Sequence, residues 1–191
     1  MRQMMPSEDP VLVKRTLSGD TQAFECLVER YKHMVFTLAV RMLRNREEAE
    51  ESAQDTFLKA YKNLESYRGG ARFSTWLYKI AYHHCLDQLK KRKSRPETTD
   101  LDSQRIISQG YEAGILDKME RDHRQHHIRV AIQSLAEQDA AIITMYYFEE
   151  WSIKEISEVT ELSPQVVKVR LFRSRKQLAS SLRPILEAEK Q

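Results

Sequence analysis

The apolar residues of this sequence recur every three or four positions over long stretches. The clearest run lies between residues 24 and 42 and consists of Phe24, Leu27, Val28, Tyr31, Val35, Leu38, Ala39 and Met42. This spacing places them on one face of an α-helix, whereas the side chains of a strand alternate with a period of two. Only five glycines and five prolines occur among 191 residues, so little interrupts such helices. The sequence therefore predicts an all-α fold.

A change of composition divides the chain into two parts. From Pro96 to about Gly114 the sequence is rich in Thr, Asp, Ser, Gln and Gly and has little periodicity, which is typical of a flexible linker. Residues 97–124 hold seven acidic side chains against four basic ones, so this segment is mildly acidic. We expect two small helical domains, at residues 1–95 and 123–191, joined by a linker at residues 96–122.

Basic residues gather in two separate places, although the net charge is only +3. Residues 90–95 contain five bases in six positions, and residues 163–183 contain six bases and no acid. Lys and Arg clusters of this kind attract polyanions. Two separated clusters predict two separated contacts with a polyanion such as nucleic acid.

The stretch from Tyr67 to Arg95 combines a glycine loop with aromatic and basic residues. We expect Ser74 to cap a helix that runs to about Lys93. Its core side would carry Leu77, Tyr78, Ala81, Cys85 and Leu89, and its other side would carry Trp76, Lys79, His83 and Lys90. A Trp among cations, after a loop with Arg68, Arg72 and Phe73, suits a platform on which unpaired bases stack. A partly buried Trp beside solvated lysines explains the pattern about equally well.

The last sixty residues predict a helix-turn-helix. Ser152 and Glu155 form the pattern of a capping box, and Ser163-Pro164 is a favourable start for a final helix. Two short helices with a basic second helix are typical of this DNA-binding motif. The face expected to point outward holds Gln165, Val169, Phe172, Arg173 and Lys176. The alternative is a helical hairpin whose basic helix only confers solubility; the outward Phe beside cations favours DNA binding.

A third surface is expected on the helix that begins after Asn45. Asn45 with Glu48 resembles a capping box, and an inward stripe comprises Ala49, Ala53, Phe57, Ala60 and Leu64. A second, mixed stripe comprises Glu51, Gln54, Asp55, Leu58 and Lys62. This stripe is either a solvated surface or a docking face for a partner protein, and the residues alone favour the solvated surface.

Other features predict little chemistry. His123, His126 and His127 could supply two metal ligands, but no further residues complete a set, so no metal site is predicted.

Cys26 and Cys85 are expected to be free, buried thiols in a reducing compartment. No signal peptide or membrane-span pattern is seen, so we expect a cytoplasmic protein without membrane insertion. No phosphate-binding loop or nucleophile elbow occurs, so we expect neither an enzyme nor a cofactor.

Taken together, the motifs resemble those of a bacterial sigma factor of the extracytoplasmic-function (ECF) group, the small branch of the sigma-70 family. The resemblance covers nearly the whole chain, and its most specific part is the run Phe73-Ser74-Thr75-Trp76-Leu77-Tyr78. Further matching positions are Asp20, Phe24, Tyr31, Ala49, Gln54, Asp55, Phe57, Tyr67, Arg68, Gly69, Lys79, Ala81, Asp87, Tyr147, Phe148, Glu149, Ser152, Glu155, Ile156, Val167, Lys168, Arg170, Leu171 and Arg173.

The resemblance implies a two-domain protein that binds core RNA polymerase, recognises promoters and melts the minus-ten element. The domain at residues 1–95 would be region two and that at residues 123–191 region four. Region two would bind the clamp helices of the largest subunit, which favours docking for Glu51, Gln54, Asp55 and Leu58; the polymerase flap is a further implied contact. The implied minus-ten set is Tyr67, Arg68, Gly69, Arg72, Phe73, Trp76, Lys79, His83 and Lys90. The implied minus-thirty-five set is Gln165, Lys168, Val169, Phe172, Arg173 and Lys176. An anti-sigma protein is the regulator that such a family member would have.

Four positions depart from the family pattern. His83 stands where Asn is common, and Glu161 stands in the turn where Gly is usual. Val169 replaces a frequent Ser, and Ala136 a frequent Pro. A left-handed backbone at residue 161 would be strained without glycine. The alternative function that the sequence leaves open is a stand-alone helix-turn-helix regulator that binds DNA without polymerase.

Overall fold

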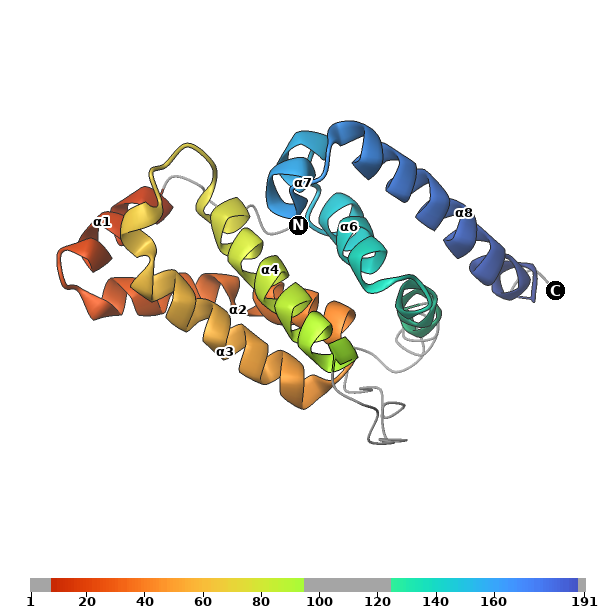
Figure 1. Ribbon diagram of the computed structural model, residues 1–191, viewed down its shortest axis with the longest axis horizontal. Helices are drawn as coiled ribbons and strands as arrows, with labels where there is room; N and C mark the ends of the chain where they lie inside the picture. Colours follow the sequence, from red (N-terminus) through yellow and green to blue (C-terminus); the bar gives the residue numbers. More distant parts are fainter. Residues whose placement is uncertain (1–7, 95–124, 189–191) are drawn as a thin grey trace.

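The computed structural model describes residues 8–94 and 125–188, and every regular element within these ranges is helical (Figure 1). The all-α prediction is confirmed. The predicted linker lies outside the described residues. The elements are α1 (Asp9–Leu17), α2 (Thr21–Leu43), α3 (Arg46–Lys62), the short 3₁₀ helix η1 (Leu64–Ser66), α4 (Phe73–Ser94), a helix that includes residues 125–133, α6 (Glu137–Tyr147), α7 (Ile153–Thr160) and α8 (Pro164–Ala188).

The N-terminal half is a bundle of α2, α3 and α4, with α1 packed across α2. Asp20 caps α2 by accepting a hydrogen bond from the Ala23 backbone N–H at 3.2 Å, and Asn45 caps α3 in the same way. The buried carboxylate of Asp9 accepts hydrogen bonds from Arg30 and from the Tyr31 hydroxyl. These charge-assisted contacts fasten α1 to α2.

The apolar stripes expected on α2 and α4 form the core. Leu77, Tyr78, Ala81, Cys85 and Leu89 of α4 are all buried. Two local expectations are wrong: Ser74 is not a cap, since α4 already begins at Phe73, and Cys26 is exposed rather than buried. Leu64 is buried, as its place in the inward stripe predicts, but it lies beyond the end of α3, in η1. Both thiols are free, as expected.

The C-terminal half contains α6, α7 and α8. The capping box at the start of α7 is confirmed, because Ser152 Oγ accepts from the Glu155 N–H and the Glu155 carboxylate accepts from the Ser152 N–H at 2.9 Å. Val167 and Leu171 anchor α8 in the core. Helix α6 ends at Tyr147, whereas its apolar pattern predicts an end near Glu149-Glu150, and Glu150 has a left-handed backbone (φ 56°) in the turn before α7.

The two halves pack against each other, with α6 beside α2 and α7 beside α4 (Figure 1). Their buried residues form one continuous core. Across the boundary, Arg41 Nη1 donates to Thr144 Oγ1 at 2.7 Å, and Arg44 Nη2 donates to the Leu135 carbonyl at 2.5 Å. Within the described ranges, the helices are too short or too polar to cross a membrane.

Candidate nucleic-acid and polymerase interfaces

An aromatic cluster stands at the start of α4. The rings of Tyr67, Phe73 and Trp76 lie with their centroids 5.4–5.5 Å apart. Phe73 is buried, whereas Tyr67 and Trp76 are half-buried. The Tyr67 hydroxyl donates to the Ala71 carbonyl at 2.9 Å and so closes the loop, in which Gly69 has a positive φ of 74°. Trp76 therefore presents only part of its ring to solvent, and the buried Phe73 ring packs against the rest.

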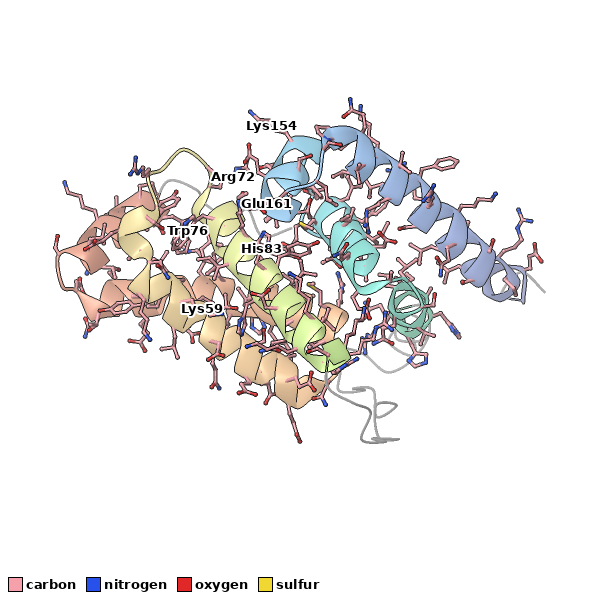
Figure 2. The ribbon with its side chains drawn as sticks, viewed as in Figure 1. Lys59, Arg72, Trp76, His83, Lys154 and Glu161 are labelled. Carbon is pink, nitrogen blue, oxygen red and sulfur yellow. The ribbon has the colours of Figure 1, made fainter. Side chains whose placement is uncertain are left out.

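The cations expected beside this cluster fall into two groups. Arg68, Arg72 and Lys90 are exposed. Lys79 and His83 are half-buried and face the C-terminal half, where Glu161 meets them both (Figure 2). Lys79 Nζ lies 2.9 Å and His83 Nε2 3.8 Å from the same carboxylate oxygen. These two side chains are thus engaged within the protein.

A cleft of about 610 Å³ separates the loop at residues 67–73 from the start of α7. Its far wall consists of Ser152, Lys154, Glu155 and Glu158. Burial acts to raise the pKa of Glu155, but hydrogen bonds from Ser152 outweigh it and leave that pKa below its ordinary value. Glu155 is therefore a carboxylate at neutral pH, 3.9 Å from Arg72 Nη1.

The pKa of Glu161 is also lowered, first by the hydrogen bond from Lys79 and then by the charges of Lys79 and His83. Its backbone is left-handed, with φ 59° and ψ 19°, which is the conformation in which the family's usual glycine would be unstrained. A left-handed backbone is unfavourable for a residue other than glycine, and in this conformation the Glu161 side chain contacts α4.

The outward face of α8 is confirmed as a solvent-exposed surface. Phe172 is 67% and Val169 47% exposed, and the polar members of the predicted set are exposed as well. Arg170 points the other way and donates to Asp139 of α6 at 2.7 Å, which fixes the rotation of α8. The DNA contacts themselves stay a prediction.

The mixed stripe of α3 is exposed at Glu51, Gln54 and Leu58. Asp55 is half-buried and lies 3.4 Å from His84 Nε2. The other ring nitrogen of His84 lies 2.5 Å from Lys59 Nζ, so His84 links the two charged residues. Burial and then the Lys59 charge lower the pKa of His84.

The described histidines form no metal site, since no cluster of three candidate ligands occurs in residues 8–94 and 125–188. His123 lies outside the described residues. Tyr78, Trp151 and Arg41 make contacts between the two halves that the sequence does not predict. A periodicity argument assigns a residue to a buried face, but it does not say which helix covers that face.

Comparison with known proteins gives two family matches in the order that the sequence predicts. The profile described as Sigma-70 region 2 matches residues 27–95, and that described as Sigma-70, region 4 matches residues 126–178. The chain is 32% identical over 94% of its length to the RNA polymerase sigma-H factor of Pseudomonas aeruginosa, covering 96% of that protein. The chain belongs to the ECF group of the sigma-70 family.

Two further relatives of this sigma factor are 32% identical to it. They are the ECF RNA polymerase sigma factor SigW of Bacillus subtilis (91% of this chain, 96% of the relative) and the ECF RNA polymerase sigma-E factor of Escherichia coli K12 (93% and 96%). Directing RNA polymerase to promoters is the function that these matches support, and sigma factors are not enzymes.

Solved structures with this fold include sigma factor RpoE from Bartonella quintana, in complex with the anti-sigma factor NepR. It has a TM-score of 0.66 at 21% identity and covers 84% of this chain and 96% of that one. CnrH in complex with the cytosolic domain of CnrY has a TM-score of 0.64 at 21% identity, covering 92% and 97%. At this identity the two structures establish the fold of our sigma factor and no more.

Proposed function

We propose that this sigma factor recruits core RNA polymerase through α3 and opens promoter DNA with the loop at residues 67–72 and the outer face of α4. The observation that carries this proposal is the half-buried Trp76, which packs on Phe73 and Tyr67 and follows a loop that bears the exposed Arg68 and Arg72. Because other rings already hold the indole in place, little conformational entropy is lost when a base stacks on it, and the guanidinium groups of Arg68 and Arg72 can bind phosphates.

Helix α8 is the proposed reader of the minus-thirty-five element. Gln165, Lys168 and Arg173 supply groups that hydrogen-bond to base edges or phosphates, while Val169 and Phe172 supply apolar surface for thymine methyls. Val166, Val169 and Phe172 are all exposed on α8, and a group of exposed apolar side chains beside basic ones supports a macromolecular contact at this face.

The proposed contact with polymerase is the exposed face of α3 at Glu51, Gln54, Asp55 and Leu58. Leu58 is 58% exposed among polar neighbours and would be the apolar centre of that contact. The clamp helices of the largest subunit are the proposed partner, with the flap as a contact for region four. We further propose regulation by an anti-sigma protein, since the structural neighbour RpoE was solved with the anti-sigma factor NepR. We also propose that the protein resides in the cytoplasm.

The decisive experiment is transcription with purified core polymerase, with and without this chain. Promoter fragments with a paired or a premelted minus-ten segment would be compared. Initiation that requires the chain supports the proposal, and activity on paired templates assigns melting to the sigma factor. Tight binding to duplex DNA without core, together with no effect on initiation, would favour the stand-alone regulator.

A further inference from the structure

Helix α7 of region four lies across the face of α4 that we propose for the minus-ten element (Figure 2). Besides the contacts of Glu161 with Lys79 and His83, His83 Nε2 lies 3.1 Å from the Val159 carbonyl at the end of α7. Lys79 and His83, two of the residues proposed to hold single-stranded DNA, are therefore occupied by region four of the same chain.

The residues that occupy this face are mostly acidic. Glu155, Glu158 and Glu161 follow at intervals of three, so they lie along one side of α7 and its turn. Glu155 approaches Arg72, Glu158 lines the cleft below the glycine loop, and Glu161 engages α4. Carboxylate oxygens make the same charge-assisted hydrogen bonds with Arg and Lys that phosphate oxygens make. On this side the cleft is lined by Ser152, Lys154, Glu155 and Glu158, and the single basic residue among these four, Lys154, is exposed.

We propose that α7 and the turn after it compete with promoter DNA for the minus-ten face, and that Glu161 is the latch of this closed form. The proposal rests on the function proposed above for that face. The predicted minus-thirty-five surface of α8 stays exposed in the closed form. Closure therefore blocks one DNA contact and leaves the other free, so that opening of the two regions is required before melting.

The interface has features of a contact that opens. The Tyr78 hydroxyl and the Arg44 Nε are buried there without hydrogen-bond partners, and such groups recover their hydrogen bonds when water reaches them. Glu161 holds a left-handed conformation that disfavours a side chain. Polar contacts such as Arg41 with Thr144 exchange readily for contacts with water. Removal of one charge should therefore shift the balance between the closed and open forms.

The test compares Glu161→Gly with Glu150→Gly in the full chain. Both residues are exposed acids in left-handed turns that flank α7, so both changes relieve the backbone and remove one carboxylate. The two differ in that Glu161 contacts Lys79 and His83 of α4, whereas the contacts found within the described residues include none between Glu150 and α4. Opening is followed by energy transfer between dyes on Glu65→Cys and Ser180→Cys, in a Cys26→Ser background. Binding is followed by the anisotropy of a labelled, mixed-sequence single-stranded oligonucleotide.

We expect Glu161→Gly to lower the energy transfer and to tighten oligonucleotide binding about two- to fivefold, the range of an exposed ion pair. Glu150→Gly should change neither. Unchanged transfer in Glu161→Gly, or an equal change in both variants, would overturn the latch. Lower transfer without tighter binding would overturn the competition. Core-dependent initiation by the unaltered chain tests the proposed function separately, so failure of that function is distinguishable from failure of the latch.

Discussion

Tyr78 of α4 and Trp151 before α7 meet edge to face across the two regions, with ring centroids 4.7 Å apart. Both rings are buried, and the Tyr78 hydroxyl has no hydrogen-bond partner. The two regions thus share an apolar contact that contains one unsatisfied polar group. Burial, with a smaller contribution from Glu149, holds the pKa of Tyr78 well above its ordinary range.

Tyr78→Phe should stabilise the protein by about 1 kcal/mol, because it removes a buried hydroxyl that makes no hydrogen bond and keeps the ring contact. Chemical denaturation monitored by circular dichroism measures this change. Tyr82→Phe, also at a buried position of α4, is the matched control because the Tyr82 hydroxyl is not among the unpaired atoms. A loss of stability in Tyr78→Phe would show that the hydroxyl is paired in solution.

Trp76→Ala should abolish melting of a paired minus-ten segment and spare recognition of the minus-thirty-five duplex, since it removes only the stacking surface. The loss on a single-stranded template is expected at about 1–3 kcal/mol for each stacked base. Permanganate footprinting measures melting, and Trp76→Tyr is the control that keeps an aromatic face. Loss of duplex recognition instead would count against this role of Trp76.

Arg173→Ala should weaken promoter binding by about 1–3 kcal/mol, and the loss should be concentrated at one base pair of the minus-thirty-five element. Affinity for a set of single-base variants of the promoter, measured with the holoenzyme, gives this pattern. Arg175, which lies near the rings of Tyr146 and Tyr147 rather than on the predicted reading face, is the matched site for a control substitution to Ala. An even loss over all sequences would reassign Arg173 to phosphate contact.

Asp55→Arg should weaken the binding of core polymerase, because it reverses one charge on the proposed α3 docking face. It also removes the contact with His84, so folding must be checked by thermal unfolding. Glu25→Arg makes the same charge reversal at an exposed position of α2 and should leave the affinity unchanged. Equal affinities for Asp55→Arg and the unaltered chain would show that the α3 stripe is an ordinary solvated surface and not a docking face.

Stability should fall in alkaline solution, and Cys85 should contribute to the fall. Burial raises the pKa of the Cys85 thiol from 9.0 to about 11, so the folded state favours the neutral thiol. Its contribution, on the order of 2–3 kcal/mol, is complete below pH 9 and is lost as the pH rises toward 11. Denaturation across this pH range should show a shallower decline in Cys85→Ala. Tyr82, whose pKa burial raises to about 12, acts in the same direction in both proteins.

Periodicity alone predicts the helices of this protein and much of its two candidate DNA faces. The buried stripe of α4 and the exposed side of α8 follow from residues three or four positions apart, which one helical turn brings together. The capping box at Ser152 is a local pattern of the same kind. The family match confirms the resemblance that these local patterns carry.

Only the tertiary structure decides what covers the outer face of α4. The sequence predicts that His83 points away from the core of its own bundle, but it predicts neither the left-handed backbone of Glu161 nor the contact between the two residues. Likewise it does not predict that Cys26 is exposed or that Asp55 pairs with His84. Such contacts depend on how whole helices pack, a sum of many weak interactions between distant parts of the chain, which no short sequence pattern encodes.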